Sequence, residues 1–316
     1  MNDIRTIDTG YMGREGFAAA YLVREGARAA FVETNANRAV PRLLAALEAD
    51  GLTPRAVEYV IITHVHLDHA GGASALMAAC PNATLLAHPR AAPHVIDPAK
   101  LVKSAQAVYG ESEFREMYGE IRPVPAERVR IMQDNETLEF GQRTLTFLHT
   151  RGHANHHFCV LDSGSNAIFT GDSFGLVYPE LQRDGLFAFP STSPTDFDAG
   201  EAKRSLDRIL ATGAERAFPT HFGEQRELEA IAAQLHRQLD VYGALADEAF
   251  ESELQSDAIG ELCQKRVRAL FNELLAEHGL DGDSATRELL ETDIDLNAQG
   301  VAFSVGKRRH KAAQRS

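Results

Sequence analysis

Cysteine is scarce in this sequence of 316 residues. The three cysteines, Cys80, Cys159 and Cys263, are an odd number and include no closely spaced pair. This pattern argues against a disulfide framework, and free thiols are the rule in a reducing compartment, so we expect a cytoplasmic protein. The N-terminus has no basic segment followed by an apolar one, so no signal peptide is expected either.

Long apolar runs and excess positive charge are also lacking. No run reaches the roughly 20 residues that a membrane-spanning helix needs, so we expect no membrane partner. Lys and Arg together number 32 and Asp and Glu 45, which gives a net charge of −13. An acidic surface repels nucleic-acid backbones, so nucleic acid is not an expected partner. The hydrophobic content of 44% is enough for a substantial core.

One short stretch of the sequence gathers side chains that bind metals. Four of them fall within six residues: His64, His66, Asp68 and His69. They follow the apolar run 57–62, which predicts a buried strand, and Gly71-Gly72 follows them. Imidazole suits Zn, Fe and Cu, and a neighbouring carboxylate widens the choice to Mn. The stretch therefore predicts a metal site on a loop at the end of a strand.

Each of three later strand candidates is followed by one further His or Asp. His153 follows the apolar run 144–148, Asp172 follows 167–169, and His221 follows 216–218. The order and approximate spacing of these motifs resemble those of the metallo-β-lactamase superfamily. This is a large group of binuclear metal hydrolases.

The resemblance implies the fold and the division of the chain. We expect an α/β protein with a four-layer αββα sandwich, the metal-hydrolase domain occupying residues 1–223. Residues 224–316 are expected to form a helical C-terminal extension. Three helical patterns in it are 224–250, 256–278 and a shorter one at 284–290. Such helices could support a homodimer, and we expect the basic tail at 307–311 to be a frayed terminus.

The same resemblance implies a binuclear metal centre with seven ligands. Two divalent ions are expected, with zinc as the first choice and iron or manganese as alternatives. The first ion is expected to be held by His64, His66 and His153, and the second by Asp68, His69 and His221. Asp172 is expected to bridge the two ions.

We expect a metal-dependent hydrolase in which a hydroxide shared by both ions attacks a small ester, thioester or lactone. Asp68 is the candidate catalytic residue, because its carboxylate could orient the attacking water or relay a proton. His66 favours hydrolysis, since oxygen-reducing members of the superfamily typically carry Glu there. Tyr178, six residues past Asp172, is a candidate for stabilising an oxyanion, as a Tyr does in lactone- and thioester-cleaving members.

Two other functions fit the same motifs. Iron-dependent persulfide dioxygenases look similar around the histidine motif and would make the protein an oxidoreductase. Some members with helical C-terminal extensions act in signalling chiefly through protein partners.

Further residues near the motifs are candidates for supporting roles. His156 and His157 follow His153 closely and could line the pocket or hydrogen-bond to a ligand. After the third expected strand the family often carries an Asp-Thr-Gly-like element. This chain has Glu33-Thr34-Asn35 there, a departure that could reshape the neighbouring loop.

Overall fold

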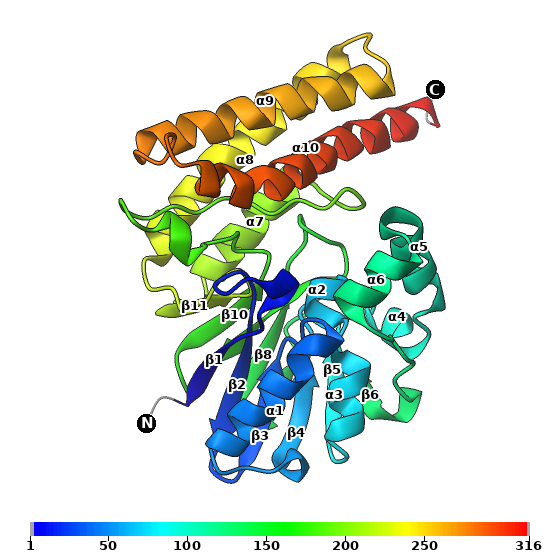
Figure 1. The fold of residues 1–316 in the computed structure, drawn as a ribbon, viewed down its shortest axis with the longest axis vertical. Coiled ribbons are helices and arrows are strands. Elements are labelled where there is room, and N and C mark those ends of the chain that lie inside the picture. The colour runs from blue at the N-terminus through cyan, green and yellow to red at the C-terminus, as the bar shows by residue number, and fades with distance from the viewer. Residues whose placement is uncertain (1–2, 315–316) are drawn as a thin grey trace. The chain divides into compact units, whose positions relative to one another are not determined.

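The computed structural model describes residues 3–314, which fall into two compact units (Figure 1). Unit 1 comprises residues 3–149, His156–Gly171 and Ala214–Arg226. Unit 2 comprises Thr150–Asn155, Asp172–Gly213 and residues 227–314. The expected domain boundary between residues 223 and 224 stays a prediction. None of the described helices is long and apolar enough to cross a membrane.

Unit 1 holds two β-sheets. The first has the order β1-β2-β3-β4-β5-β6 and the second the order β11-β10-β9-β8-β7. The strands of the first sheet are β1 (Ile4–Asp8), β2 (Ala19–Glu25), β3 (Arg28–Val32), β4 (Val57–Ile61), β5 (Thr84–Ala87) and β6 (Val129–Ile131). Those of the second are β7 (Thr137–Phe140), β8 (Arg143–His149), β9 (Phe158–Asp162), β10 (Ala167–Gly171) and β11 (Arg216–Pro219).

Apolar side chains pack the two sheets face to face. Their shared core contains Tyr21 and Val32 from the first sheet and Phe147, Phe169 and Phe218 from the second. The opposite face of the first sheet is covered by helices, with Leu43 and Leu76 among the buried contacts. The helices of unit 1 are α1 (Val40–Ala49), α2 (Leu67–Ala70), α3 (Ala73–Ala79), α4 (Ala92–Ile96), α5 (Ala99–Tyr109) and α6 (Glu111–Tyr118).

The strands that were expected to deliver metal ligands are present. β4, β8, β10 and β11 correspond to the four apolar runs, so these strand predictions are confirmed. β4 lies between β3 and β5 and is parallel to both. A parallel strand that is covered on both faces is apolar almost throughout, which is why the run was recognisable. The three-residue strand β6 was too short to give such a signal.

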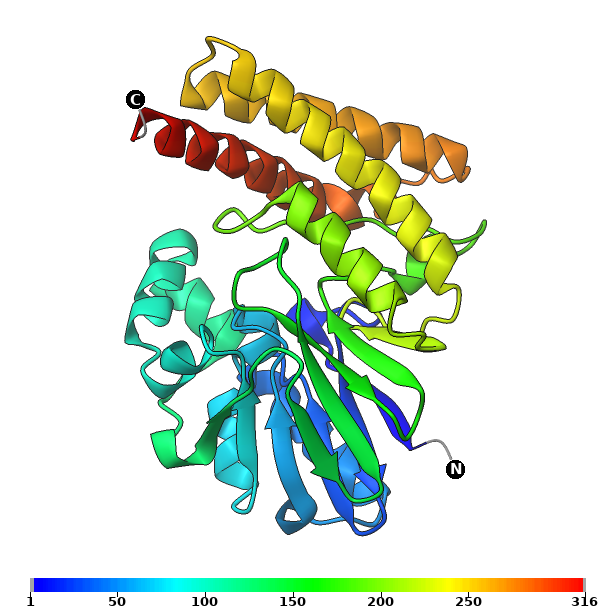
Figure 2. The same cartoon turned by 180° about the vertical axis from the view of Figure 1, so that it is seen from behind.

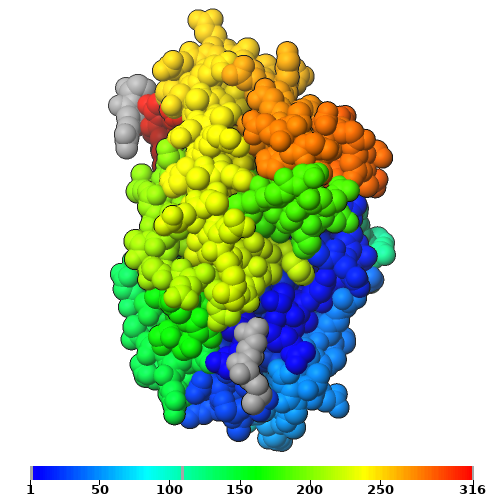
Figure 3. Space-filling model, turned by 90° about the vertical axis from the view of Figure 1, so that its left-hand side faces the viewer, coloured from blue at the N-terminus to red at the C-terminus, as the bar shows by residue number. Residues whose placement is uncertain are grey.

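Unit 2 is built around the helices α7 (Ala199–Leu210), α8 (Leu228–Glu251), α9 (Ser256–Glu277) and α10 (Ser284–Ala313). α10 packs on α8 and α9, and α7 packs on α8 (Figure 2). The segment around 180–187 lies against the end of α9, where His278 Nε2 is 3.0 Å from Leu186 O (Figure 3).

The expectation of a short helix at 284–290 and a frayed basic tail is wrong. α10 continues to Ala313 and includes the tail. Arg308 Nη1 donates to Asp247 Oδ1 at 2.8 Å, and Arg309 donates to Ala249 O at 2.7 Å and Leu254 O at 2.6 Å. The last carbonyls of a helix lack partners within it, so Arg309 satisfies the end of α8 and orders the tail.

One buried cation joins separate parts of unit 1. Arg143, 2% exposed, donates to Asp162 Oδ2 at 2.6 Å, to Glu25 Oε2 at 3.0 Å and to Asp3 Oδ2 at 3.2 Å. Asp162 is fully buried, so its charge depends on this partner. The Arg143 hydrogen bond also holds the pKa of the Glu25 carboxyl below its ordinary value.

Replacing Arg143 by Met should lower the free energy of unfolding by about 3–5 kcal/mol, because it leaves the buried Asp162 carboxylate without a counter-charge. Urea unfolding followed by circular dichroism measures this. Arg5→Met is the matched control: Arg5 pairs with Asp50 at the surface, and losing that pair should cost about 0–1 kcal/mol. Equal losses in both variants would contradict the role of Arg143.

Candidate metal centre

The histidine motif begins on a tight turn after β4 and continues into α2 in unit 1. His66 caps the N-terminus of α2 with an extended backbone, and its carbonyl accepts hydrogen bonds from the N–H groups of His69 and Ala70. The turn brings His64 Nε2 to 2.8 Å from His66 Nδ1. Two imidazole nitrogens that face each other this closely suit a cation that both can ligate.

Hydrogen bonds fix which nitrogen of His64 faces that point. Thr63 Oγ1 donates to the Glu33 carboxylate, so toward His64 it can only accept. His64 Nδ1, 3.1 Å away, therefore carries the proton and donates to Thr63. The Nε2 lone pair is left toward His66, and the ring is fully buried.

A second group in unit 1 consists of Asp68, His69 and His221. Asp68 Oδ2 is 3.6 Å from His69 Nε2 and 3.4 Å from His221 Nε2. One donor atom from each residue lies within 4.8 Å of the others, close enough for a shared ion. His221 Nδ1 is 2.7 Å from Phe17 O and donates to it, so Nε2 is the nitrogen that is available to a metal ion.

The outer nitrogen of His69 is held by a buried carboxylate. His69 Nδ1 donates to Glu33 Oε1 at 3.2 Å, and that oxygen also accepts from Thr63 and Thr220. Glu33 is 1% exposed, and within the described residues its Oε2 has no hydrogen-bond partner. A buried carboxylate with one oxygen left without a hydrogen bond fits neighbouring cations. The residues of unit 1 therefore suit divalent metal ions.

Sequence reasoning missed this role of Glu33. The Glu33-Thr34-Asn35 element was recognised only as a departure from the family pattern. A signal was available, because Glu33 directly follows β3, and β3 pairs with β4, which leads into the histidine motif. Parallel neighbours end at the same edge of a sheet, so acids and histidines after them meet.

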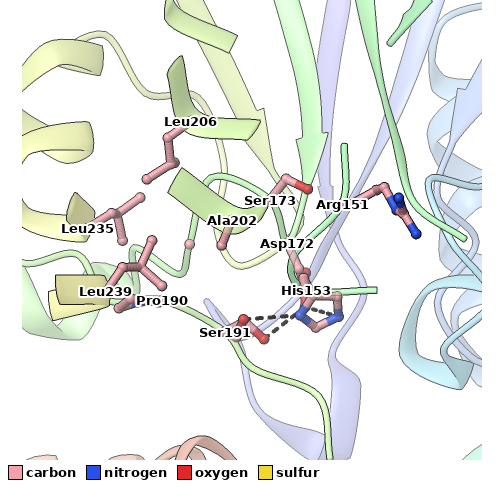
Figure 4. Close-up of a pocket in the computed structure, with 11 residues that line it drawn as sticks. Arg151, His153, Asp172, Ser173, Pro190, Ser191, Ala202, Leu206, Leu235 and Leu239 are labelled. Carbon is pink, nitrogen blue, oxygen red and sulfur yellow. Dashed lines mark hydrogen bonds and ion pairs between the residues drawn. The ribbon is translucent and has the colours of Figure 1, made fainter. Parts of the chain in front are cut away.

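Unit 2 carries the two remaining expected ligands, His153 and Asp172. His153 Nε2 is 3.6 Å from Asp172 Oδ2, and both residues are buried (Figure 4). Ser191 holds both: its carbonyl accepts from His153 Nδ1 at 3.2 Å, and its hydroxyl donates to Asp172 Oδ2 at 3.2 Å. His153 therefore presents Nε2 toward the Asp172 carboxylate, just as His69 and His221 present Nε2 toward Asp68.

The loop that carries His153 is fixed to α7. Gly152 has φ 119°, and a Cβ there would collide with the backbone of Ala202, so only glycine fits. Ser205 Oγ donates to Arg151 O at 2.6 Å, and the N–H of Asp198 donates to Gly152 O at 2.9 Å. These contacts fix the position of the backbone that carries His153.

The residues that were expected to have supporting roles, His156, His157 and Tyr178, lie in different surroundings. His156 and His157 lie beside His64 in unit 1, with ring centroids 5.9 Å and 4.9 Å from its ring. Tyr178 is 1% exposed, and its hydroxyl donates to Asp293 Oδ1 on α10 at 3.4 Å. The expected oxyanion role of Tyr178 stays a prediction.

The comparisons with known proteins agree with these motifs. The family model described as the metallo-beta-lactamase superfamily matches residues 13–221. The chain therefore belongs to the metallo-β-lactamase superfamily.

Proteins named as thioesterases are among the relatives of this chain. The atrochrysone carboxyl ACP thioesterase of Aspergillus fumigatus is 24% identical over 264 residues, which are 81% of this chain and 69% of that protein. The acyl-coenzyme A thioesterase MBLAC2 of Gallus gallus is 27% identical over 184 residues, which are 55% of this chain. This chain spans 59% of the length of that second relative.

Solved structures share the fold. An archaeal metallo-beta-lactamase superfamily protein from Sulfolobus tokodaii aligns with a TM-score of 0.67 and 20% identity, covering 95% of this chain and 98% of that one. A metallo-beta-lactamase family protein from Thermus thermophilus aligns with a TM-score of 0.63 and 18% identity over 99% of this chain and 95% of its own. The expected αββα sandwich with a C-terminal helical region is confirmed.

Replacing Glu33 by Gln should weaken metal binding about 10–100-fold, because the carboxylate that orients His69 loses its charge. Competition with a chromophoric chelator measures the affinity without relying on turnover. Glu58→Gln removes a carboxylate that pairs with Arg28 at 3.5 Å on the surface, and should leave metal binding unchanged. If both variants bind metal like the unaltered protein, Glu33 does not support the centre.

Proposed function

We propose that this protein is a metal-dependent hydrolase that cleaves thioesters of small acyl groups. The observation that carries the proposal is the cluster of Asp68, His69 and His221, whose candidate ligating atoms face one another while the outer nitrogens of both buried histidines are held by the protein. Relatives named as thioesterases support the choice of a thioester over an ester or lactone.

We further propose that all seven expected residues serve one binuclear centre. Asp172 directly follows Gly171, the last residue of β10, and consecutive Cα atoms are about 3.8 Å apart. His221 follows β11 by two residues, and β10 and β11 are parallel neighbours. Chain connectivity thus supports Asp172 and His221 leaving one edge of a sheet together. His153, four residues past β8, joins the first ion by resemblance to the family.

When bound, divalent ions would supply a nucleophile at neutral pH, because they lower the pKa of a bound water toward about 7. Asp68 is the residue we assign to handling that water's proton. Its side chain is 27% exposed, whereas His69 is fully buried, so Asp68 is the member of its group that solvent reaches most readily. Zinc is our first choice of metal, with iron or manganese as alternatives.

The hydrolase proposal predicts that thioester cleavage requires metal. Protein stripped with a chelator should not cleave acyl-CoA substrates, and added Zn, Fe or Mn should restore release of the free thiol, which a thiol-reactive dye detects. Oxygen uptake with glutathione persulfide, measured on the same samples, distinguishes a dioxygenase. The proposal is wrong if metal-loaded protein cleaves no thioester, or if stripping leaves cleavage intact.

Replacing Asp172 by Ala should remove at least one metal ion per chain, because the proposed bridging carboxylate is lost. Elemental analysis of the purified variant gives the stoichiometry directly. Asp240→Ala is the matched control in unit 2, since Asp240 is an exposed carboxylate on α8 that pairs with Lys203 at the surface. Full metal occupancy in Asp172→Ala would contradict the bridging assignment.

A further inference from the structure

One loop of unit 1, residues 9–18 between β1 and β2, contacts the segment that carries His221 (Figure 1). The N–H of Ala19, where β2 begins, donates to Thr220 O at 2.8 Å. Phe17 O accepts from His221 Nδ1 at 2.7 Å. The ring of Phe17 also meets the imidazole of His221 edge to face, with centroids 6.0 Å apart. The loop therefore borders the second group of candidate metal ligands.

Hydrogen bonds hold the backbone of this loop in one shape. The Asp8 carboxylate accepts from the N–H of Gly10 at 2.8 Å and from that of Gly16 at 2.6 Å. Between these two glycines, the N–H of Arg14 donates to Tyr11 O at 3.0 Å and closes a single 3₁₀ turn. The main chain of Arg14 is therefore fixed, and its side chain starts from a defined point.

The side chain of Arg14 lies over the ring of Phe17. Its Cζ is 5.9 Å from the ring centroid, within the range of a cation–π interaction. On the same ring stacks Tyr11, which is 8% exposed, with centroids 6.1 Å apart and ring planes inclined by 12°. The Arg14 guanidinium and the His221 imidazole thus contact the same phenyl ring, and that ring is held by its aromatic neighbour.

The charge of Arg14 has no partner of opposite sign. In the part of the chain that the structure describes, no carboxylate forms an ion pair with Arg14, although acidic residues outnumber basic ones by 45 to 32. The side chain is also exposed to solvent. A guanidinium presents five N–H donors in a planar fork that matches the oxygens of a carboxylate or phosphate. An unpaired guanidinium one phenyl ring away from a candidate metal ligand is therefore suited to an anion.

We infer that Arg14 binds an anionic group of the substrate, so that the preferred thioesters of this protein carry a negative charge. The inference rests on the proposed thioester hydrolysis and adds the chemical class of the substrate. The anion is a carboxylate on the acyl group or a phosphate on the thiol carrier, because both offer two or more oxygens to one guanidinium. A ligand from solvent can reach this place, since Arg14 is exposed and the Asp68 side chain is 27% exposed.

Three pantetheine thioesters distinguish the two sources of the anion. Valeryl-pantetheine is uncharged, glutaryl-pantetheine has a carboxylate in place of the terminal methyl group, and valeryl-4′-phosphopantetheine carries a phosphate. One of the two anionic substrates should have a kcat/KM about 10-fold above that of the neutral one, since hydrogen bonds to charged groups contribute on that scale. The preferred anionic substrate identifies the source.

Arg14→Met should reduce this ratio of kcat/KM, anionic over neutral, to about 1, because the side chain keeps its length and loses its charge. Arg55→Met is the matched control: Arg55 is exposed and lies two residues before β4, whereas the histidine motif follows the end of that strand. Arg14→Lys should keep part of the ratio, since the charge remains without the fork. Added salt should lower the ratio in the unaltered protein and leave it unchanged in Arg14→Met. Equal metal content in all variants excludes an effect through His221.

A binding measurement gives a readout besides turnover. The non-hydrolysable thioethers S-pentyl-pantetheine, S-(4-carboxybutyl)-pantetheine and S-pentyl-4′-phosphopantetheine match the three substrates. Calorimetry should show about 10-fold tighter binding of the matching anionic compound than of the neutral one, and Arg14→Met should remove the difference. If thioesters are cleaved but neither anion is preferred, or Arg14→Met keeps the ratios of Arg55→Met, the anion site is wrong and the hydrolase stands. If no thioester is cleaved, the hydrolase proposal falls and this inference with it.

Discussion

The hydrogen bond from His69 to the buried Glu33 carboxylate is the constraint on which the centre in unit 1 depends. An imidazole has two nitrogens, and a metal ligand must present the correct one without its proton. Glu33 fixes which nitrogen of His69 carries the proton. Thr63 does the same for His64, and the Phe17 carbonyl does so for His221. Because these acceptors are main-chain atoms or buried groups near strand ends, the sheet fixes the direction of each candidate ligand.

The local parts of this arrangement could be predicted well from the sequence. Four expected ligands sit within six residues, and the rest each follow a short apolar run, so periodicity and spacing were enough to find the strands β4, β8, β10 and β11. Glu33 was missed as a supporting residue because its role arises from the pairing of β3 with β4. That pairing joins residues thirty positions apart in the sequence, so the only local signal was the position of Glu33 directly after an expected strand.

Unit 2 shows the same limit on prediction. Leu235 and Leu239 recur at helical spacing, and that pattern indicates a buried face of α8 without indicating which helices cover it. The length of α10 was also missed, since its polar and small residues weaken the amphipathic signal. Gly300 is one of them, and a Cβ there would collide with the side chain of Thr192. The helix is continuous because tertiary contacts order it.

Arg309 shows how a tertiary contact made by α10 completes another helix. Its guanidinium supplies the hydrogen bonds that α8 cannot make for its own final carbonyls, at Ala249 and Phe250, about sixty residues earlier in the sequence. The C-terminal end of α8 thus depends on a residue near the C-terminal end of α10. During synthesis on the ribosome, α8 would emerge long before its cap, so this helix end is completed only once α10 has been made and docked.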